Sequence, residues 1–263
     1  MAYPFSMLSE LQRAELLRFA EALADEVRPL LLQAHAQSET AIEIKSDGTP
    51  VTVADREAEA LMRAKIKKTY PHHGILGEEF GAENADAEYC WVLDPIDGTK
   101  SFLSRVPLYT TLIGLRYQGQ PSLGLIDQPV LRERVVGDGV VTKFNGKIVR
   151  AKEVPLNQAV VVGSDFDHIR RYQPQAHWTR LADAVAHTRT WGDGYGYLLV
   201  ATGRAQVVVD PVMNPWDIIP ILPLLKGAGA KVTSWQGGDA LSAGNVIAAA
   251  PQLHAAVLQT LGV

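Results

Sequence analysis

Apolar residues recur every three or four positions over the first part of the chain, which is the spacing of one helix face. This pattern predicts a long amphipathic helix over residues 7–36 and a second helix from Val53 to Tyr70, which Pro71 ends. Short apolar runs follow at Gly74–Leu76 and Tyr89–Leu93. Because these runs are brief and are bounded by polar residues, we interpret them as buried strands.

The pattern changes between Tyr109 and Val149, where short runs of Val, Ile, Leu and Thr alternate with Gly, Pro and Asn. This alternation predicts an antiparallel meander, in which Asn145-Gly146 is the strongest hairpin turn. Beyond Pro155, strands and helices alternate. The predicted strands are 160–162, 206–209, 231–233 and 245–249, and the predicted helices are 174–186, 193–202, 215–228 and 251–261.

The order of these elements predicts two layered halves. Residues 1–155 would form an N-terminal α+β half, and residues 156–263 a C-terminal α/β half. No repeat, low-complexity linker or block of like charge separates them, so we expect one compact unit. A chain of 263 residues with 47% hydrophobic residues is large enough for a sizeable core.

Composition narrows the possible partners. The formal charge of −4 and the pI near 6.0 give no electrostatic footprint for nucleic acid. No segment has the core of a signal peptide, and none approaches the roughly 18 apolar residues of a membrane span. We therefore expect a cytoplasmic protein that binds neither nucleic acid nor membranes. The single cysteine, Cys90, lies in an apolar run and is interpreted as a buried, inert thiol.

The chemistry is concentrated in the string Asp94-Pro95-Ile96-Asp97-Gly98-Thr99, which directly follows an apolar strand. Pro95 restricts the backbone around Asp94, and Gly98 allows a tight turn close to a ligand. Two carboxylates held together at a strand end repel each other unless a cation lies between them. Magnesium prefers such oxygen ligands. The alternative is an ordinary turn, with Thr99 capping the next helix.

Three other acidic segments could join this site. Glu78 follows the glycine that ends another apolar strand, Asp217 lies in the first turn of an apolar helix, and Asp55 leads into the second helix. Each has a simpler interpretation: a solvated surface glutamate, a carboxylate favoured by the helix dipole, or an early-turn acid. Pro220 and Pro223 also predict that the helix behind Asp217 is kinked or short.

Taken in order, these segments resemble the inositol monophosphatase family of lithium-sensitive, magnesium-dependent phosphatases. The resemblance runs from about residue 43 to 235, includes Lys45, and rests most on the DPIDGT string and the later Trp216-Asp217 pair. It implies a layered α-β-α-β-α sandwich of the inositol monophosphatase and fructose-bisphosphatase type. It also implies a homodimer that hydrolyses a small phosphorylated metabolite.

The resemblance also implies a role for each acidic segment. One Mg²⁺ would be held by Glu78, Asp94, the Ile96 carbonyl and Thr99, and a second by Asp94, Asp97 and Asp217. A third, weaker ion would involve Glu78 and water, which gives two or three ions in all. Glu78, Thr99 and Asp55 would orient the attacking water, Asp55 acting through solvent. The amides of Gly98 and Thr99 would receive the phosphate, as helix N-termini do.

The substrate is predicted from less specific strings. Segments such as Ile126-Asp127-Gln128-Pro129 and Trp191-Gly192-Asp193-Gly194 resemble the histidinol-phosphate phosphatase branch, although they could equally serve packing. Asp210 would contact the organic part of the substrate, with Asp193 and Asn214 as neighbouring candidates. We therefore predict histidinol-phosphate hydrolysis in histidine biosynthesis. The alternatives are an inositol-1-monophosphatase or broad sugar-phosphate phosphatase, and a non-catalytic small-molecule sensor on the same fold.

Overall fold

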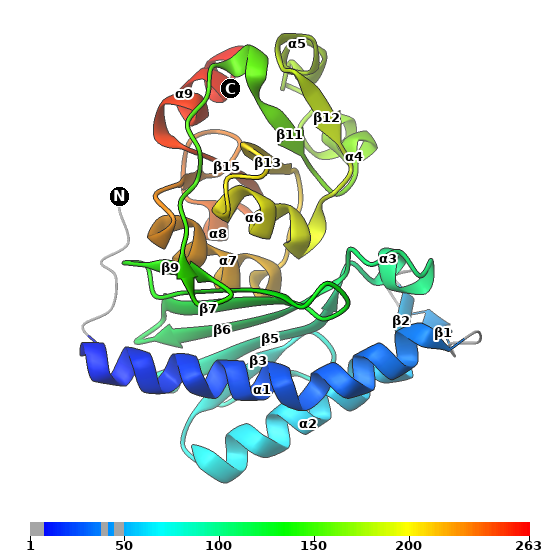
Figure 1. Ribbon diagram of the computed structural model, residues 1–263, viewed down its shortest axis with the longest axis vertical. Helices are drawn as coiled ribbons and strands as arrows, with labels where there is room; N and C mark the ends of the chain where they lie inside the picture. Colours follow the sequence, from blue (N-terminus) through cyan, green and yellow to red (C-terminus); the bar gives the residue numbers. More distant parts are fainter. Residues whose placement is uncertain (1–7, 38–41, 45–49) are drawn as a thin grey trace.

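The structure is a computed structural model that describes residues 8–37, 42–44 and 50–263. Lys45 and the turn predicted around it lie outside the described residues. Five layers alternate between helices and sheets (Figure 1): the pair α1 and α2, the larger sheet, the helices α6 and α7, the smaller sheet, and the outer helices α4, α5 and α9. This arrangement agrees with the predicted α+β sandwich.

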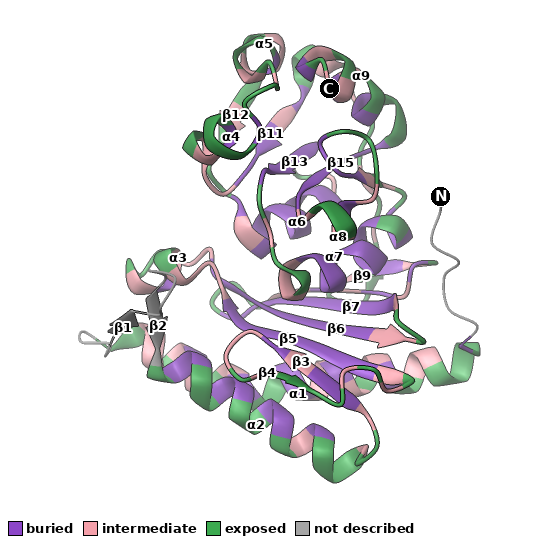
Figure 2. Ribbon diagram, turned by 180° about the vertical axis from the view of Figure 1, so that it is seen from behind, coloured by how far each residue is buried: buried purple, intermediate pink, exposed green. Residues whose placement is uncertain are grey.

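The first layer consists of α1 (Glu10–Ala36) and α2 (Val53–Thr69). α1 begins three residues later than predicted because Ser9 is its N-cap and forms a capping box with Gln12. Between the helices, β1 (Ile42–Ile44) and β2 (Pro50–Thr52) pair antiparallel. The buried faces of α1 and α2 share one core cluster with β5, β6 and β7, as the burial colours show (Figure 2). None of the helices in the described ranges is long and apolar enough to cross a membrane.

The larger sheet has eight strands in the order β10-β9-β8-β7-β6-β5-β3-β4, and only the β3–β5 pair is parallel. Its strands are β3 (Gly74–Gly77), β4 (Gly81–Glu83), β5 (Tyr89–Asp97), β6 (Thr110–Tyr117), β7 (Gln120–Gln128), β8 (Glu133–Gly137), β9 (Thr142–Phe144) and β10 (Lys147–Ile148). The predicted hairpin turn is confirmed, since Asn145 and Gly146 join β9 to β10 with φ of 44° and 81°.

β5 extends past its predicted end and carries the acidic string. Its pairing with β6 shifts between Asp94 and Asp97, where Asp94 lies opposite Leu112 and Asp97 opposite Thr110. One extra residue on β5 is therefore accommodated, as in a β-bulge. The bulge interrupts the regular alternation of side chains along the strand. The two carboxylates at this end of the strand can therefore point to the same side. The short helix α3 (Thr99–Leu103) follows directly.

The smaller sheet has the order β12-β11-β13-β15-β14. Its strands are β11 (Val160–Val162), β12 (His187–Arg189), β13 (Val207–Asp210), β14 (Lys231–Thr233) and β15 (Val246–Ala249). The helices of this half are η1 (Leu156–Gln158), α4 (Phe166–Tyr172), α5 (Trp178–Ala184), α6 (Asp193–Ala201), α7 (Pro215–Gly227), α8 (Ala240–Ala243) and α9 (Pro251–Leu261). The first sheet ends at Ile148 and the second begins at Val160, while the division of the chain at residue 155 stays a prediction.

Two predictions for this half were wrong in detail. The helix predicted over 174–186 is shorter, because α5 begins only at Trp178. The preceding helix α4 and the strand β12 were not predicted. Both are short and polar: α4 buries only Ile169, and β12 has no buried residue. Neither therefore has the hydrophobic periodicity by which a helix or strand is recognised.

The prediction of a short helix behind Asp217 was also wrong, because α7 runs from Pro215 to Gly227, while the predicted kink stays a prediction. Pro220 and Leu224 of this helix lie against a row of glycines, Gly114, Gly124 and Gly137, that are paired across β6, β7 and β8. A Cβ added at Gly124 would lie 1.8 Å from the Pro220 carbonyl oxygen, and one at Gly137 would lie 3.0 Å from the Leu224 Cα. The missing side chains let the helix backbone rest directly on the sheet.

We expect Gly124→Ala to lower the free energy of unfolding by about 1–3 kcal/mol, because the added methyl group would overpack the α7–sheet contact. Denaturation by urea would measure this loss. Gly238→Ala is a matched control, since its added Cβ would meet only the Ser234 Oγ, at 3.4 Å. Equal stability of the two variants would contradict a close contact between α7 and the sheet.

Candidate active site

The contact between α7 and the sheet brings three carboxylates together. One oxygen from each of Asp94, Asp97 and Asp217 lies within 4.8 Å of the other two. Asp94 and Asp97 come from the bulged end of β5, and Asp217 comes from the first turn of α7. The predicted convergence of these three residues is therefore present in the fold, while their role as ligands stays a prediction.

The carboxylates perturb one another strongly. The pKa of Asp94 is well above its ordinary value, first because of burial and then because of the charges of Glu78, Asp97 and Asp217. Burial and the charge of Asp193 likewise raise the pKa of Asp97. Burial raises the pKa of Asp217 to about 7. A cation between these groups would remove the repulsion and favour their ionised forms.

The donor set fits a hard divalent cation. The Asp94 side chain is only 2% exposed, and its Oδ1 atom has no hydrogen-bond partner in the part of the chain that the structure describes. A buried carboxylate oxygen without a donor is costly, and a metal ion would satisfy it. Every candidate ligand atom is an oxygen, which is the preference of Mg²⁺ rather than of softer metals.

Backbone donors fix the orientation of the other two carboxylates. The amide of Gly194 donates to Asp97 Oδ2, and the Thr110 hydroxyl donates to the same oxygen at 3.4 Å. The amide of Asn214, the N-cap of α7, donates to Asp217 Oδ2 at 2.8 Å. These bonds hold one oxygen of each carboxylate and leave the second available.

The turn after β5 places the predicted phosphate-binding residues beside this cluster. Gly98 has a φ of 85°, a conformation that favours glycine. The Thr99 hydroxyl donates to the Ile96 carbonyl at 3.2 Å, so two of the predicted oxygen ligands lie next to each other. Ile96 itself is buried, and Thr99 begins α3.

Glu78 is positioned by a residue that sequence reasoning missed. The carboxylate of Glu59 is fully buried in α2 and accepts a hydrogen bond from the Glu79 amide at 2.7 Å and one from Arg63 Nε at 2.7 Å. A Cβ at Gly77 would lie 1.9 Å from Glu59 Oε1, so only glycine permits this approach. The one available signal was the spacing of Glu59 and Arg63, four residues apart on the buried side of α2.

A cavity of about 450 Å³ opens beside the cluster. The predicted site residues among those that line it are Glu78, Asp97, Gly98, Thr99, Asp193, Asp210, Asn214 and Asp217. Residues of the lining that were not predicted include Lys100, Ser164, Asp165, His168, Tyr197 and Met213. Asp55 is buried in the first turn of α2 and lies outside this lining, as do Asp94 and Ile96.

Asp210 is held more tightly than a simple substrate contact requires. Its Oδ1 accepts hydrogen bonds from the Ser164 amide at 3.0 Å and hydroxyl at 2.7 Å, and its Oδ2 accepts one from the Tyr197 hydroxyl at 2.6 Å. Burial nonetheless raises its pKa to about 6. The Asp193 amide donates to the same Ser164 hydroxyl at 2.9 Å, and burial raises the pKa of Asp193 as well. Ser164 therefore connects two of the predicted substrate-binding residues.

The raised pKa of Asp217 predicts that the free energy of unfolding of the metal-free protein depends on pH. Its folded pKa of about 7 lies above its ordinary 3.8, so the folded state binds the proton more tightly and loses stability as the pH rises between these values. Asp217→Asn cannot ionise and should raise the free energy of unfolding by about 2 kcal/mol at pH 8, allowing for solvent screening of this half-buried carboxylate. The gain should vanish below about pH 3, where the group is protonated in both the folded and the unfolded state.

Urea denaturation in EDTA at a series of pH values measures this difference. Asp183→Asn, on the exposed side of α5, is the control and should change stability little at any pH. An Asp217→Asn protein that is less stable than the parent at pH 8 without metal would contradict the electrostatic account.

Comparisons with known proteins agree with this geometry. The sequence model described as "Inositol monophosphatase family" matches residues 12–262. The chain is 38% identical over 235 residues to the bifunctional phosphatase IMPL2, chloroplastic, of Arabidopsis thaliana, covering 87% of this chain and 68% of that protein. It is 35% identical to the histidinol-phosphatase of Chlorobaculum parvum, covering 89% and 91%.

A solved structure of an inositol monophosphatase from Zymomonas mobilis superposes with a TM-score of 0.84 at 32% identity, covering 97% of this chain and all of that chain. The family match, the fold and the predicted acidic string thus agree. The resemblance inferred from the sequence is confirmed: the chain belongs to the inositol monophosphatase family of metal-dependent, typically Mg²⁺-dependent, phosphatases and is a phosphoric monoester hydrolase.

Proposed function

We propose that this phosphatase hydrolyses histidinol phosphate, and that the charge of its pocket selects the substrate. Besides the acidic cluster, the cavity is lined by the carboxylates of Asp165, Asp193 and Asp210. Among the residues that the structure describes, Lys100 is the only lysine or arginine in the lining. An ester whose organic part carries an ammonium group would meet complementary charge there, whereas a neutral polyol would not.

The names of the relatives support the same substrate. The Chlorobaculum parvum protein is named histidinol-phosphatase, and so is a Mycobacterium tuberculosis protein that is 32% identical over 93% of this chain. The Zymomonas mobilis structure is named as an inositol monophosphatase, so inositol phosphate remains the second candidate. Asp210 and Ser164 could accept hydrogen bonds from sugar hydroxyls, which is the feature that favours this alternative.

We further propose that two or three Mg²⁺ ions are held by the carboxylates of Glu78, Asp94, Asp97 and Asp217, with Thr99 and the Ile96 carbonyl as further oxygen ligands. Bound magnesium would supply positive charge against the phosphate oxygens and would lower the pKa of a water molecule.

The protein's own groups would perform the remaining tasks. The amides of Gly98 and Thr99 would bind the phosphate, and Glu78 and Thr99 would orient the attacking water. Asp55 would act on that water through solvent. Asp193, Asp210 and Asn214 would hold the organic part, so that the leaving oxygen lies opposite the water for in-line displacement.

A substrate panel tests the assignment. We expect kcat/KM for histidinol phosphate to exceed that for inositol 1-phosphate, fructose 1,6-bisphosphate and a nucleoside 3′,5′-bisphosphate by about tenfold or more, equivalent to about 1.4 kcal/mol. Asp94→Asn and EDTA should abolish turnover of every ester. Equal kcat/KM across the panel would exclude the histidinol assignment and leave the phosphatase class intact.

Asp165→Asn separates charge from structure. Asp165 caps α4 by accepting a hydrogen bond from the Asp167 amide at 2.9 Å, and asparagine preserves this cap. Loss of the carboxylate should raise KM for histidinol phosphate about three- to tenfold and leave KM for inositol phosphate unchanged, because only the former carries an ammonium group. A parallel rise in both KM values would show a structural effect instead of charge recognition.

We also propose that the enzyme is a homodimer. Exposed apolar side chains lie near one another at Val106, Val130 and Leu131, and Gln128 joins these segments by donating to the Pro107 carbonyl at 3.0 Å. Sedimentation velocity at micromolar concentration should give the mass of two chains for the parent and a shift toward one chain for Leu131→Asp. A monomeric parent would refute the dimer.

A further inference from the structure

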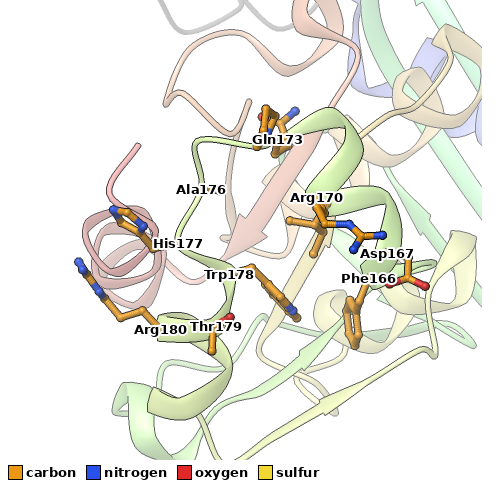
Figure 3. A pocket seen from close by; sticks show the side chains of 11 residues that line it. Phe166, Asp167, Arg170, Gln173, Ala176, His177, Trp178, Thr179 and Arg180 are labelled. Carbon is orange, nitrogen blue, oxygen red and sulfur yellow. The ribbon is translucent and has the colours of Figure 1, made fainter.

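A second cavity, of about 630 Å³, is lined in part by α4 (Figure 3), which also contributes to the lining of the active-site cavity. Its walls are α4 and the segment 176–180 at the start of α5. Asp165 and His168 line the active-site cavity, whereas Phe166 and Arg170 line the second one. One seven-residue helix thus presents different faces to two pockets.

Two aromatic rings form the apolar part of the second pocket. Phe166 and Trp178 point toward each other, with ring centroids 4.7 Å apart and planes inclined by 37° (Figure 3). Ile169 beneath them is 2% exposed. Both rings are only partly buried, so part of their surface faces the pocket. Such a site favours a planar aromatic group, which gains offset-stacking and edge contacts.

The charges around this pocket favour an anion. Arg170 and Arg180 line it together with a single carboxylate, Asp167. Neither arginine makes an ion pair or a hydrogen bond with any residue that the structure describes. A guanidinium beside these two tilted rings matches a carboxylate, to which it can donate two parallel hydrogen bonds.

We propose that this pocket is an effector site for a small planar aromatic carboxylate, and that its occupation changes the affinity of the active site for the phosphate ester. The inference goes beyond the proposed substrate, since it concerns a separate pocket and a ligand of opposite charge to the ammonium group.

Hydrogen bonds attach both ends of α4 to the segment 210–211, and this attachment connects the second pocket to the active site. At its start, the Ser164 amide and hydroxyl donate to the Asp210 carboxylate. At its end, the buried Gln173 donates from Nε2 to the Pro211 carbonyl at 3.1 Å. A ligand pressed against Phe166 would therefore act on a helix that carries active-site residues and is fixed at both ends to the segment 210–211.

The opposite wall is anchored elsewhere. The His177 amide donates to the Leu261 carbonyl at 2.8 Å, at the end of α9. Ligand binding would thus bridge a wall fixed to the C-terminal helix and a wall fixed to the active site. A change in the distance between the two walls must therefore move α4 relative to α9 or relative to the active site.

Fluorine NMR of protein labelled with 5-fluorotryptophan tests binding, with indole-3-acetate as the probe and the neutral indole-3-acetamide as its control. The five tryptophans give separate signals, and Trp178→Phe assigns the one in this pocket. We expect a saturable shift of the Trp178 signal with a Kd below about 1 mM for the acid and at least about fivefold weaker binding of the amide.

Two neighbouring arginines of α4 provide matched variants. Arg170→Gln should weaken binding of the acid about tenfold, and Arg171→Gln, which lies outside the pocket lining, should leave it unchanged. Saturating acid should change KM of the best phosphate ester at least about twofold in the parent and in Arg171→Gln, but not in Arg170→Gln.

Absence of a saturable Trp178 shift up to about 10 mM acid would overturn the proposal. So would equal losses in the two arginine variants, or a response at Trp191 or Trp216 in place of Trp178, because the chain neighbours of these two tryptophans, Thr190 and Asp217, line the active-site cavity. Binding without any change in KM would refute the coupling through α4. The NMR measurement needs no turnover, so its failure is distinguishable from failure of the substrate assignment.

Discussion

The central constraint on this structure is the mutual repulsion of the carboxylates that the fold brings together in one place. Asp94, Asp97 and Asp217 have oxygens within 4.8 Å of one another, and burial together with like charge raises the pKa of all three. Such an arrangement is unfavourable in a metal-free protein and favourable when divalent cations occupy it. The surrounding fold must therefore be rigid enough to hold the acids against their repulsion, which explains how much local structure is devoted to their support.

That support comes from backbone contacts that side chains would block. Gly124 and Gly137 allow α7 to lie on the sheet, so Asp217 reaches the end of β5. Gly77 allows Glu59 to hold the turn that carries Glu78. In each case a helix end or a turn is fixed by close packing or by backbone amides, so the acidic cluster is organised by the main chain as much as by its own side chains.

The sequence predicted the local features and missed those that depend on distant contacts. The long helices, the meander and the Asn145-Gly146 turn follow from hydrophobic periodicity and turn chemistry, which are encoded within a few residues. Pro220 and Pro223 indicated a short helix, because local rules do not include a facing row of glycines on another element. Ser164 could not be recognised as a partner of Asp210, since the two are 46 positions apart and only the fold brings them together.

The acidic cluster and the other carboxylates that line the cavity form one electrostatic arrangement. Cations at Asp94, Asp97 and Asp217 would attract the phosphate, whereas Asp165, Asp193 and Asp210 would attract a positively charged organic group. A zwitterionic ester therefore has only one favourable orientation, because reversing it would place each charge against its like. Ser164 fixes two residues of this second group of carboxylates, because its hydroxyl donates a hydrogen bond to Asp210 and accepts one from the Asp193 amide. Ser164 also leads directly into α4. In the proposed function, substrate orientation would thus depend on the position of a short, largely polar helix, and that helix also lines the second pocket.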